Sequence, residues 1–134
     1  MTALSVVAQD LGLTQLECRF IEAMLSATPL AASGGSTMVP VATLAKVVEQ
    51  DLEPEEREEL NLTEMLRNGV GVVLAGLLRQ PRTCRVASEG VLVSFCVLDM
   101  VTMQEGAGFV QFHLNPMFLD LLSRVAADRG IAVF

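Results

Sequence analysis

The stretch VLVSFCVLDMVTMQEGAGFVQFHLNPMF, residues 91–118, indicates a β-hairpin that leads into a helix. Its two runs rich in Val and Phe flank residues 104–108, which include two glycines. Glycine readily adopts the positive φ angles that short hairpin loops require. Asn115 suits a helix N-cap and Pro116 the first helical position, so a helix is expected to begin here. Helices, then a β-hairpin, then one more helix is an order found in winged-helix domains.

Alternation within residues 109–114 predicts which side of the hairpin is buried. Val110, Phe112 and Leu114 share one face of the strand, and the residues between them share the other. Upstream, residues 83–87 are expected to form a strand, and Ser88-Glu89-Gly90 the turn into the long strand 91–103. We therefore expect a three-stranded antiparallel sheet of residues 83–87, 91–103 and 109–114.

Two helices are expected before residue 27. Apolar residues at helical spacing predict a helix over 3–11, with Gly12 as its C-cap. Thr14-Gln15-Leu16-Glu17 is a capping box, in which the Thr14 hydroxyl and the Glu17 carboxylate each bond to the other's backbone amide. The helix that it starts should end near Ser26.

The middle of the chain combines a short strand with helices. Residues 37–39 predict an edge strand that Pro40 closes, because proline has no amide proton to donate. A helix should follow to about Glu49, and Asn61-Leu62-Thr63-Glu64 resembles a second capping box. Glycines in Asn68-Gly69-Val70-Gly71 predict a kink or two abutting helices within 62–79. A phosphate-binding loop is disfavoured there, since no GKS/T follows.

The composition fits one domain with an aliphatic core. The 134 residues are 51% hydrophobic, yet include no Trp, no Tyr and only six Phe. We expect a single domain over 1–134, with an N-terminal helix in 1–12, a core over 13–124 and a tail over 125–134. The longest apolar run, residues 69–78, is too short to cross a membrane, and no secretion signal precedes the first helix. A cytoplasmic location is expected, and the apolar ending 131–134 should pack against a sheet edge or another subunit.

The residue types argue against catalysis and against metal binding. Cys18, Cys84 and Cys96 show no paired spacing and are expected to be reduced and structural. The only histidine, His113, lies in an apolar strand, where a satisfied or partly exposed role is favoured over a catalytic one. We therefore expect no enzyme activity, no metal, no cofactor and no small-molecule substrate.

The net charge of −7 is local, which keeps nucleic acid among the candidate partners. Residues 49–64 contain eight acidic residues and one arginine, which together account for the net charge of −7. The remainder of the chain is therefore neutral. The acidic run is read as a solvated helix face rather than a partner site. Four arginines fall within nineteen positions that contain no acid, and they are the candidate DNA-binding residues: Arg67, Arg79, Arg82 and Arg85. A plain surface role for them remains open.

Four segments carry a resemblance to a known family. They are Leu13-Thr14-Gln15-Leu16-Glu17, Val41-Ala42-Thr43-Leu44-Ala45, Leu77-Leu78-Arg79-Gln80 and the run from Phe109 through Asn115-Pro116 to Leu119. Over roughly residues 13–124 the chain resembles the first winged-helix domain of bacterial plasmid replication initiator proteins. The resemblance implies an α+β winged helix with a three-stranded sheet, a β-hairpin wing and four to six helices. It also implies dimerisation and contact with the DNA backbone.

The chain departs from that family in two respects. We expect no second winged helix, the part that reads the bases of the origin in those initiators, and basic residues are fewer than such initiators carry. The chain is then either a shortened initiator domain or a relative that now serves protein contacts. Three functions are weighed: a non-enzymatic, DNA-associated, dimerising protein of DNA replication, a protein-interaction module without direct DNA binding, and an enzyme, which the lack of a catalytic residue set disfavours.

Overall fold

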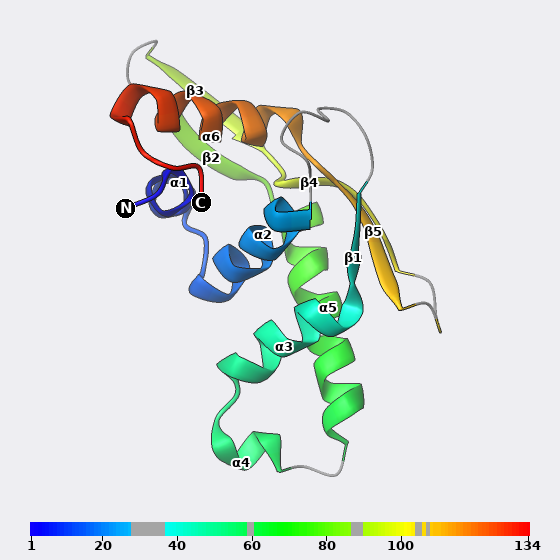
Figure 1. Cartoon of the computed structure of the whole chain (residues 1–134). Helices are drawn as coiled ribbons and strands as arrows, with labels where there is room; N and C mark the ends of the chain where they lie inside the picture. Colours follow the sequence, from blue (N-terminus) through cyan, green and yellow to red (C-terminus); the bar gives the residue numbers. More distant parts are fainter. Residues whose placement is uncertain (28–36, 59–60, 87–89, 104–105, 107) are drawn as a thin grey trace.

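The computed structural model describes residues 1–27, 37–58, 61–86, 90–103, 106 and 108–134 of the chain (Figure 1). Here the fold is α+β, with six helices, a three-stranded antiparallel sheet and a separate two-stranded sheet. The elements are α1 (Ala3–Leu11), α2 (Gln15–Ala27), β1 (Thr37–Pro40), α3 (Val41–Asp51), α4 (Pro54–Arg57), α5 (Leu62–Arg79), β2 (Arg82–Val86), β3 (Val91–Phe95), β4 (Leu98–Met103), β5 (Phe109–Leu114) and α6 (Pro116–Arg129).

The three-stranded sheet has the order β1-β5-β4, with β5 in the centre. Its register sets Val39 opposite Val110 and Val101 opposite Phe112. Val110, Phe112 and Leu114 are buried, whereas Phe109 is exposed, so the predicted alternation along β5 is confirmed. Strand β1 lies at an edge, as the proline at residue 40 predicts.

The predicted composition of this sheet is wrong. The run 91–103 does not form one strand: it divides at Cys96 and Val97 into β3, which pairs with β2, and β4, which pairs with β5. Asn115 holds this break, because its side-chain amide donates to the Cys96 carbonyl and its backbone N–H to the Val97 carbonyl, each at 2.9 Å. Strand β1 therefore replaces residues 83–87 as the third strand. The predicted turn at 88–89 lies outside the described residues, as do Gln104, Glu105 and Ala107 of the hairpin loop.

Most of the predicted helix ends are confirmed. Gly12 ends α1 at a φ of 68°, and the Thr14 amide donates to the Glu17 carboxylate at 3.0 Å while the Glu17 amide donates to the Thr14 hydroxyl at 3.1 Å. The Asn115 side chain accepts from the Met117 amide at the start of α6. The capping box expected at Asn61 is wrong, because the Asn61 side chain makes no capping bond.

Helix α5 is unbroken over eighteen residues, so the alternative of two abutting helices is wrong. A Cβ placed on Gly69 would lie 2.8 Å from Cγ1 of Val48 on α3, which is closer than carbon atoms pack. The close approach of α3 and α5 therefore explains why residue 69 is a glycine.

The helices enclose one core. The core includes Phe20 of α2, Leu44 of α3, Leu74 of α5 and Phe118 of α6, all almost fully buried. Figure 1 shows α4 at one end of the molecule and α1, α6 and the β2–β3 pair at the other.

The end of the chain lies against its beginning. Helix α6 continues to Arg129, beyond the point where a tail was expected, and residues 131–134 follow it. The carbonyls of Ala132 and Val133 accept from the Ala3 and Leu4 amides at 2.8 Å, so the apolar ending caps α1 of its own chain. No helix in the described ranges is long and apolar enough to span a bilayer.

Candidate nucleic-acid interface

Arg67 and Arg79 are exposed on α5, a helix that buries one side and leaves the other open. Val70, Leu74 and Leu77 form its buried stripe. The two arginines are twelve residues apart, which corresponds to about 18 Å along the axis and a third of a turn around it. They are exposed, have no partner among the described residues, and are too far apart to contact the same phosphate.

Arg82, the third predicted arginine, is bound within the fold. Its side chain is only 13% exposed, and Nη2 lies 2.7 Å from Oε2 of Glu17 at the start of α2. Nη1 donates to the Gly12 carbonyl at 3.3 Å, and Nη2 also donates to Oε1 of Gln80 at 3.2 Å. A phosphate could reach this guanidinium only by displacing those partners.

Arg85 lies three residues further along β2 and is exposed opposite Leu92 of β3. Cys84 and Phe95 are buried, so the β2–β3 pair has one covered and one open face. Thr83 and Ser94 lie on the open face with Arg85, and their hydroxyls are 3.2 Å apart. The structure thus distributes three exposed arginines over α5 and β2 and does not gather all four into one compact cluster.

The described part of the acidic segment lies in and around α4, at the end of the molecule away from β2. Glu53, Glu55, Glu56 and Glu58 are exposed in and around α4. Arg57 does not pair with them in the described part: its Nε and Nη2 donate to the carbonyls of Glu49 and Gln50 at 3.0 and 3.2 Å, at the end of α3. Figure 1 places α4 away from β2, so Arg85 lies far from these carboxylates.

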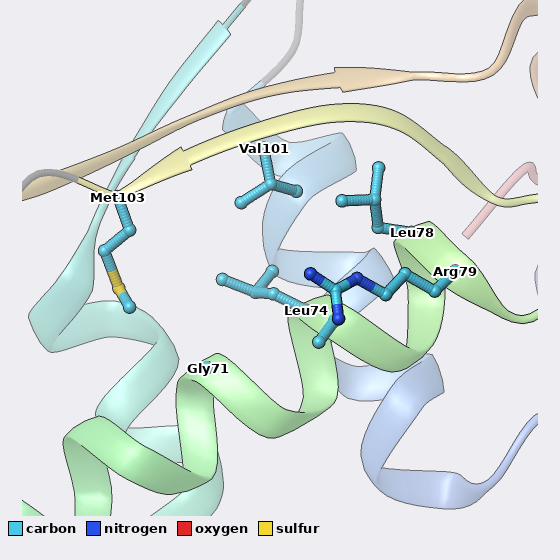
Figure 2. A pocket seen from close by; sticks show the side chains of 7 residues that line it. Gly71, Leu74, Leu78, Arg79, Val101 and Met103 are labelled. Carbon is cyan, nitrogen blue, oxygen red and sulfur yellow. The ribbon is translucent and has the colours of Figure 1, made fainter.

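A groove of about 190 Å³ lies between α5 and β4. Figure 2 shows Val101 and Met103 extending from β4 toward α5, with Arg79 running along the helix toward Leu74. The arginine is the only charged residue of the lining, which otherwise comprises Gly71, Leu74, Ala75, Leu78, Val101 and Met103. No local pattern in the sequence indicates this groove, because its two walls, α5 and β4, are separate segments that meet only in the folded chain.

Cys84 is buried, whereas Cys18, Cys96 and His113 are partly buried. All three cysteines are unpaired. Burial raises the pKa of Cys18, with Glu22 and Glu17 adding to the shift, and burial followed by the charge of Asp10 raises the pKa of Cys84. His113 lies 3.1 Å from Asp99 and is partly exposed. No group of three potential metal ligands occurs within the residues that the structure covers.

Comparison with protein-family models, curated proteins and solved structures found no match to this chain.

Proposed function

We propose that the chain is a non-enzymatic winged-helix protein of the plasmid replication-initiator type, which dimerises and associates with double-stranded DNA in the cytoplasm. The observation that carries the proposal is the strand order β1-β5-β4, with α3, α4 and α5 between β1 and the β4–β5 hairpin. In a winged helix the second hairpin strand pairs with a strand that precedes the second helix. In this correspondence α2, α3 and α5 are the three helices, and the β2–β3 pair is an addition.

Three arginines are available for phosphate contact in this proposal. Arg67, Arg79 and Arg85 are exposed on elements that carry no acid between residues 67 and 85. Arg82 is left out because Glu17 holds it. Contacts of this kind position a protein on DNA without reading bases, so binding should show little sequence preference.

A duplex titration followed by fluorescence anisotropy at several salt concentrations tests DNA association. Three phosphate contacts should give a slope of log K against log salt of about −2.7, since each contact contributes about −0.9. Arg79→Glu should weaken binding uniformly across sequences and make the slope shallower by about 0.9. Arg129→Glu, the same charge reversal on α6, is the matched control and should leave the slope unchanged. Absence of a complex at low salt would reject DNA association.

A second function is favoured by the surface of α5 between the two arginines. Val72 is 72% exposed there, and Asn68 and Ala75 add no charge. A helix that reads DNA usually presents polar or basic side chains to the groove. We therefore keep a protein-interaction module as the alternative, to be preferred if the titration shows no complex.

A further inference from the structure

The groove between α5 and β4 is apolar apart from one charge. Its volume is about 190 Å³, and Arg79 is the only charged side chain among the described residues that line it. An engineered cavity of about 150 Å³ with apolar walls holds a benzene molecule. Pockets for drug-sized ligands are larger, at about 300–1,000 Å³. The groove therefore has the size of a site for one aromatic ring.

Small residues on α5 keep the floor of the groove open. Gly71 and Ala75 are four residues apart, so they lie on the same face of the helix. A Cβ on Gly71 would lie 3.8 Å from Cε of Met103, at ordinary van der Waals distance. Figure 2 shows Val101 and Met103 extending from β4 toward α5. A flat ring in this space would contact the methionine side chain, and thioethers make favourable contacts with aromatic rings.

Arg79 supplies a polar partner at the edge of the groove. It is exposed, and no described residue pairs with it. Arg79 is the last residue of α5, but helical side chains lean toward the N-terminus, and Figure 2 shows it running back toward Leu74. The guanidinium therefore lies beside the groove rather than over the negative C-terminal end of the helix. A guanidinium in such a place can bind a carboxylate through two parallel hydrogen bonds.

The charge of the groove favours an anion with a single negative charge. One guanidinium neutralises one charge, and no second basic residue lines the groove in the described part of the chain. A phosphate monoester carries about 1.5 to 2 negative charges near pH 7, so part of its charge would stay uncompensated. A carboxylate matches the single arginine.

We propose that this groove binds a small carboxylic acid whose apolar part is one aromatic ring. The carboxylate binds Arg79, and the ring lies between α5 and β4 against Leu74, Val101 and Met103. The site goes beyond the proposed function and does not depend on DNA binding.

A titration of the full chain with 3-phenylpropionate, followed by the NMR shifts of amides and methionine methyl groups, tests the site. A ligand of about eleven non-hydrogen atoms should bind with a Kd of about 0.1–1 mM. The Met103 methyl signal should shift, because this group lies in the groove. The neutral 3-phenylpropanol lacks the charged partner, and acetate lacks the ring, so each should bind at least about tenfold more weakly.

Variants separate the charge from the apolar space. Arg79→Gln should weaken binding of 3-phenylpropionate about tenfold and leave binding of 3-phenylpropanol unchanged, because only the acid uses the guanidinium. A general disturbance of the fold would weaken both. Arg129→Gln, also at an exposed arginine in the last turn of its helix, is the matched control and should leave both affinities unchanged. Ala75→Leu fills the floor of the groove and should abolish binding of both compounds.

Three results would each overturn the proposal. They are equal affinity for the acid and the alcohol, shifts that map away from α5 and β4, and unchanged binding of the acid by Arg79→Gln. The absence of any shift at about 10 mM 3-phenylpropionate would overturn it as well. Circular dichroism establishes that Ala75→Leu folds; if that variant does not fold, Arg79→Gln at its exposed position still decides the question.

Discussion

Glu17 and Arg82 form an ion pair that joins the start of α2 to β2, with Oε2 and Nη2 2.7 Å apart. The other carboxylate oxygen, Oε1, accepts from the Thr14 amide at 3.0 Å. Both side chains are nearly buried, at 11% and 13% exposed. One carboxylate therefore caps a helix and neutralises an arginine 65 residues away.

Replacing Glu17 should destabilise the fold more than the loss of an exposed ion pair would. Glu17→Ala leaves the Arg82 guanidinium unpaired in a nearly buried site and removes the cap, so the free energy of unfolding should fall by about 3 kcal/mol. Glu17→Gln retains an acceptor for Thr14 and should cost less, about 1–2 kcal/mol. Urea denaturation should show lower midpoints at an unchanged m-value.

The control for this prediction is the exposed pair of Asp120 and Arg124 on α6, 2.9 Å apart with both side chains more than half exposed. Asp120→Asn should change the free energy of unfolding by no more than about 0.5 kcal/mol. If Glu17→Ala behaved like Asp120→Asn, the ion pair would have no structural importance and Arg82 would again be available for DNA.

Alanine at two neighbouring glycines of α5 should have opposite effects. At Gly71 a new Cβ would meet only Cε of Met103, at 3.8 Å, so Gly71→Ala should stabilise the fold by about 0.5–1 kcal/mol through helix propensity. At Gly69 the new Cβ would lie 2.8 Å from Cγ1 of Val48, a side chain that is stiff in a helix. Gly69→Ala should therefore destabilise by about 1–2 kcal/mol.

Thermal unfolding of the Gly69→Ala and Gly71→Ala variants tests this prediction, and a second substitution at Val48 tests the cause of the expected clash. Val48→Ala removes the clashing methyl group, so the double variant with Gly69→Ala should lose less stability than the two single losses added together. Equal stabilisation by both glycine substitutions would show that α3 and α5 can separate at no cost.

Local signals in the sequence predict where helices and strands begin and end better than they predict which strands pair with each other. The box at Thr14 and Glu17, the Asn115-Pro116 start of α6 and the alternation along β5 depend on neighbouring residues, and the structure confirms them. The division of residues 91–103 has no local signal, because Cys96 and Val97 are not turn formers. It depends on hydrogen bonds from Asn115, nineteen residues later in the chain.

The same distinction applies to the candidate interface. The spacing of the four arginines is visible in the sequence. The ion pair with Glu17, which makes Arg82 unavailable for DNA, is not, since the two residues meet only through tertiary packing. The reason for a glycine at residue 69 is likewise not visible in the sequence, because the space beside it is filled by Val48 of α3. Contacts between distant segments decided each of these points.

Cys18 should react slowly with alkylating agents in the folded protein. Burial, then the charges of Glu22 and Glu17, raises its pKa, so little thiolate is present near pH 8. Iodoacetamide labelling followed by mass spectrometry should be slower in the native chain than in urea. Glu22→Gln removes one of the charges and should speed labelling of Cys18 while leaving that of Cys84 unchanged.

The raised pKa values also predict a pH dependence of stability. The folded state holds the protons of Cys18 and Cys84 more tightly than the unfolded chain does. This contribution is fully present below the unfolded thiol pKa of about 8.5 and is lost as the pH rises above it. Urea midpoints should therefore fall as the pH rises above about 8.5, and replacing both Cys18 and Cys84 by Ala should flatten that decline.

Asn115 should contribute through two separable hydrogen bonds. Its Oδ1 accepts from the Met117 amide and its Nδ2 donates to the Cys96 carbonyl, both at 2.9 Å. Asn115→Ala loses both and should destabilise by about 2 kcal/mol, whereas Asn115→Ser keeps a capping oxygen and should cost about 1 kcal/mol. Hydrogen exchange at Met117 should accelerate in the Ala variant and stay slow in the Ser variant. A Ser variant as stable as the unaltered chain would mean that the backbone bond from Asn115 to Val97 alone maintains the break between β3 and β4.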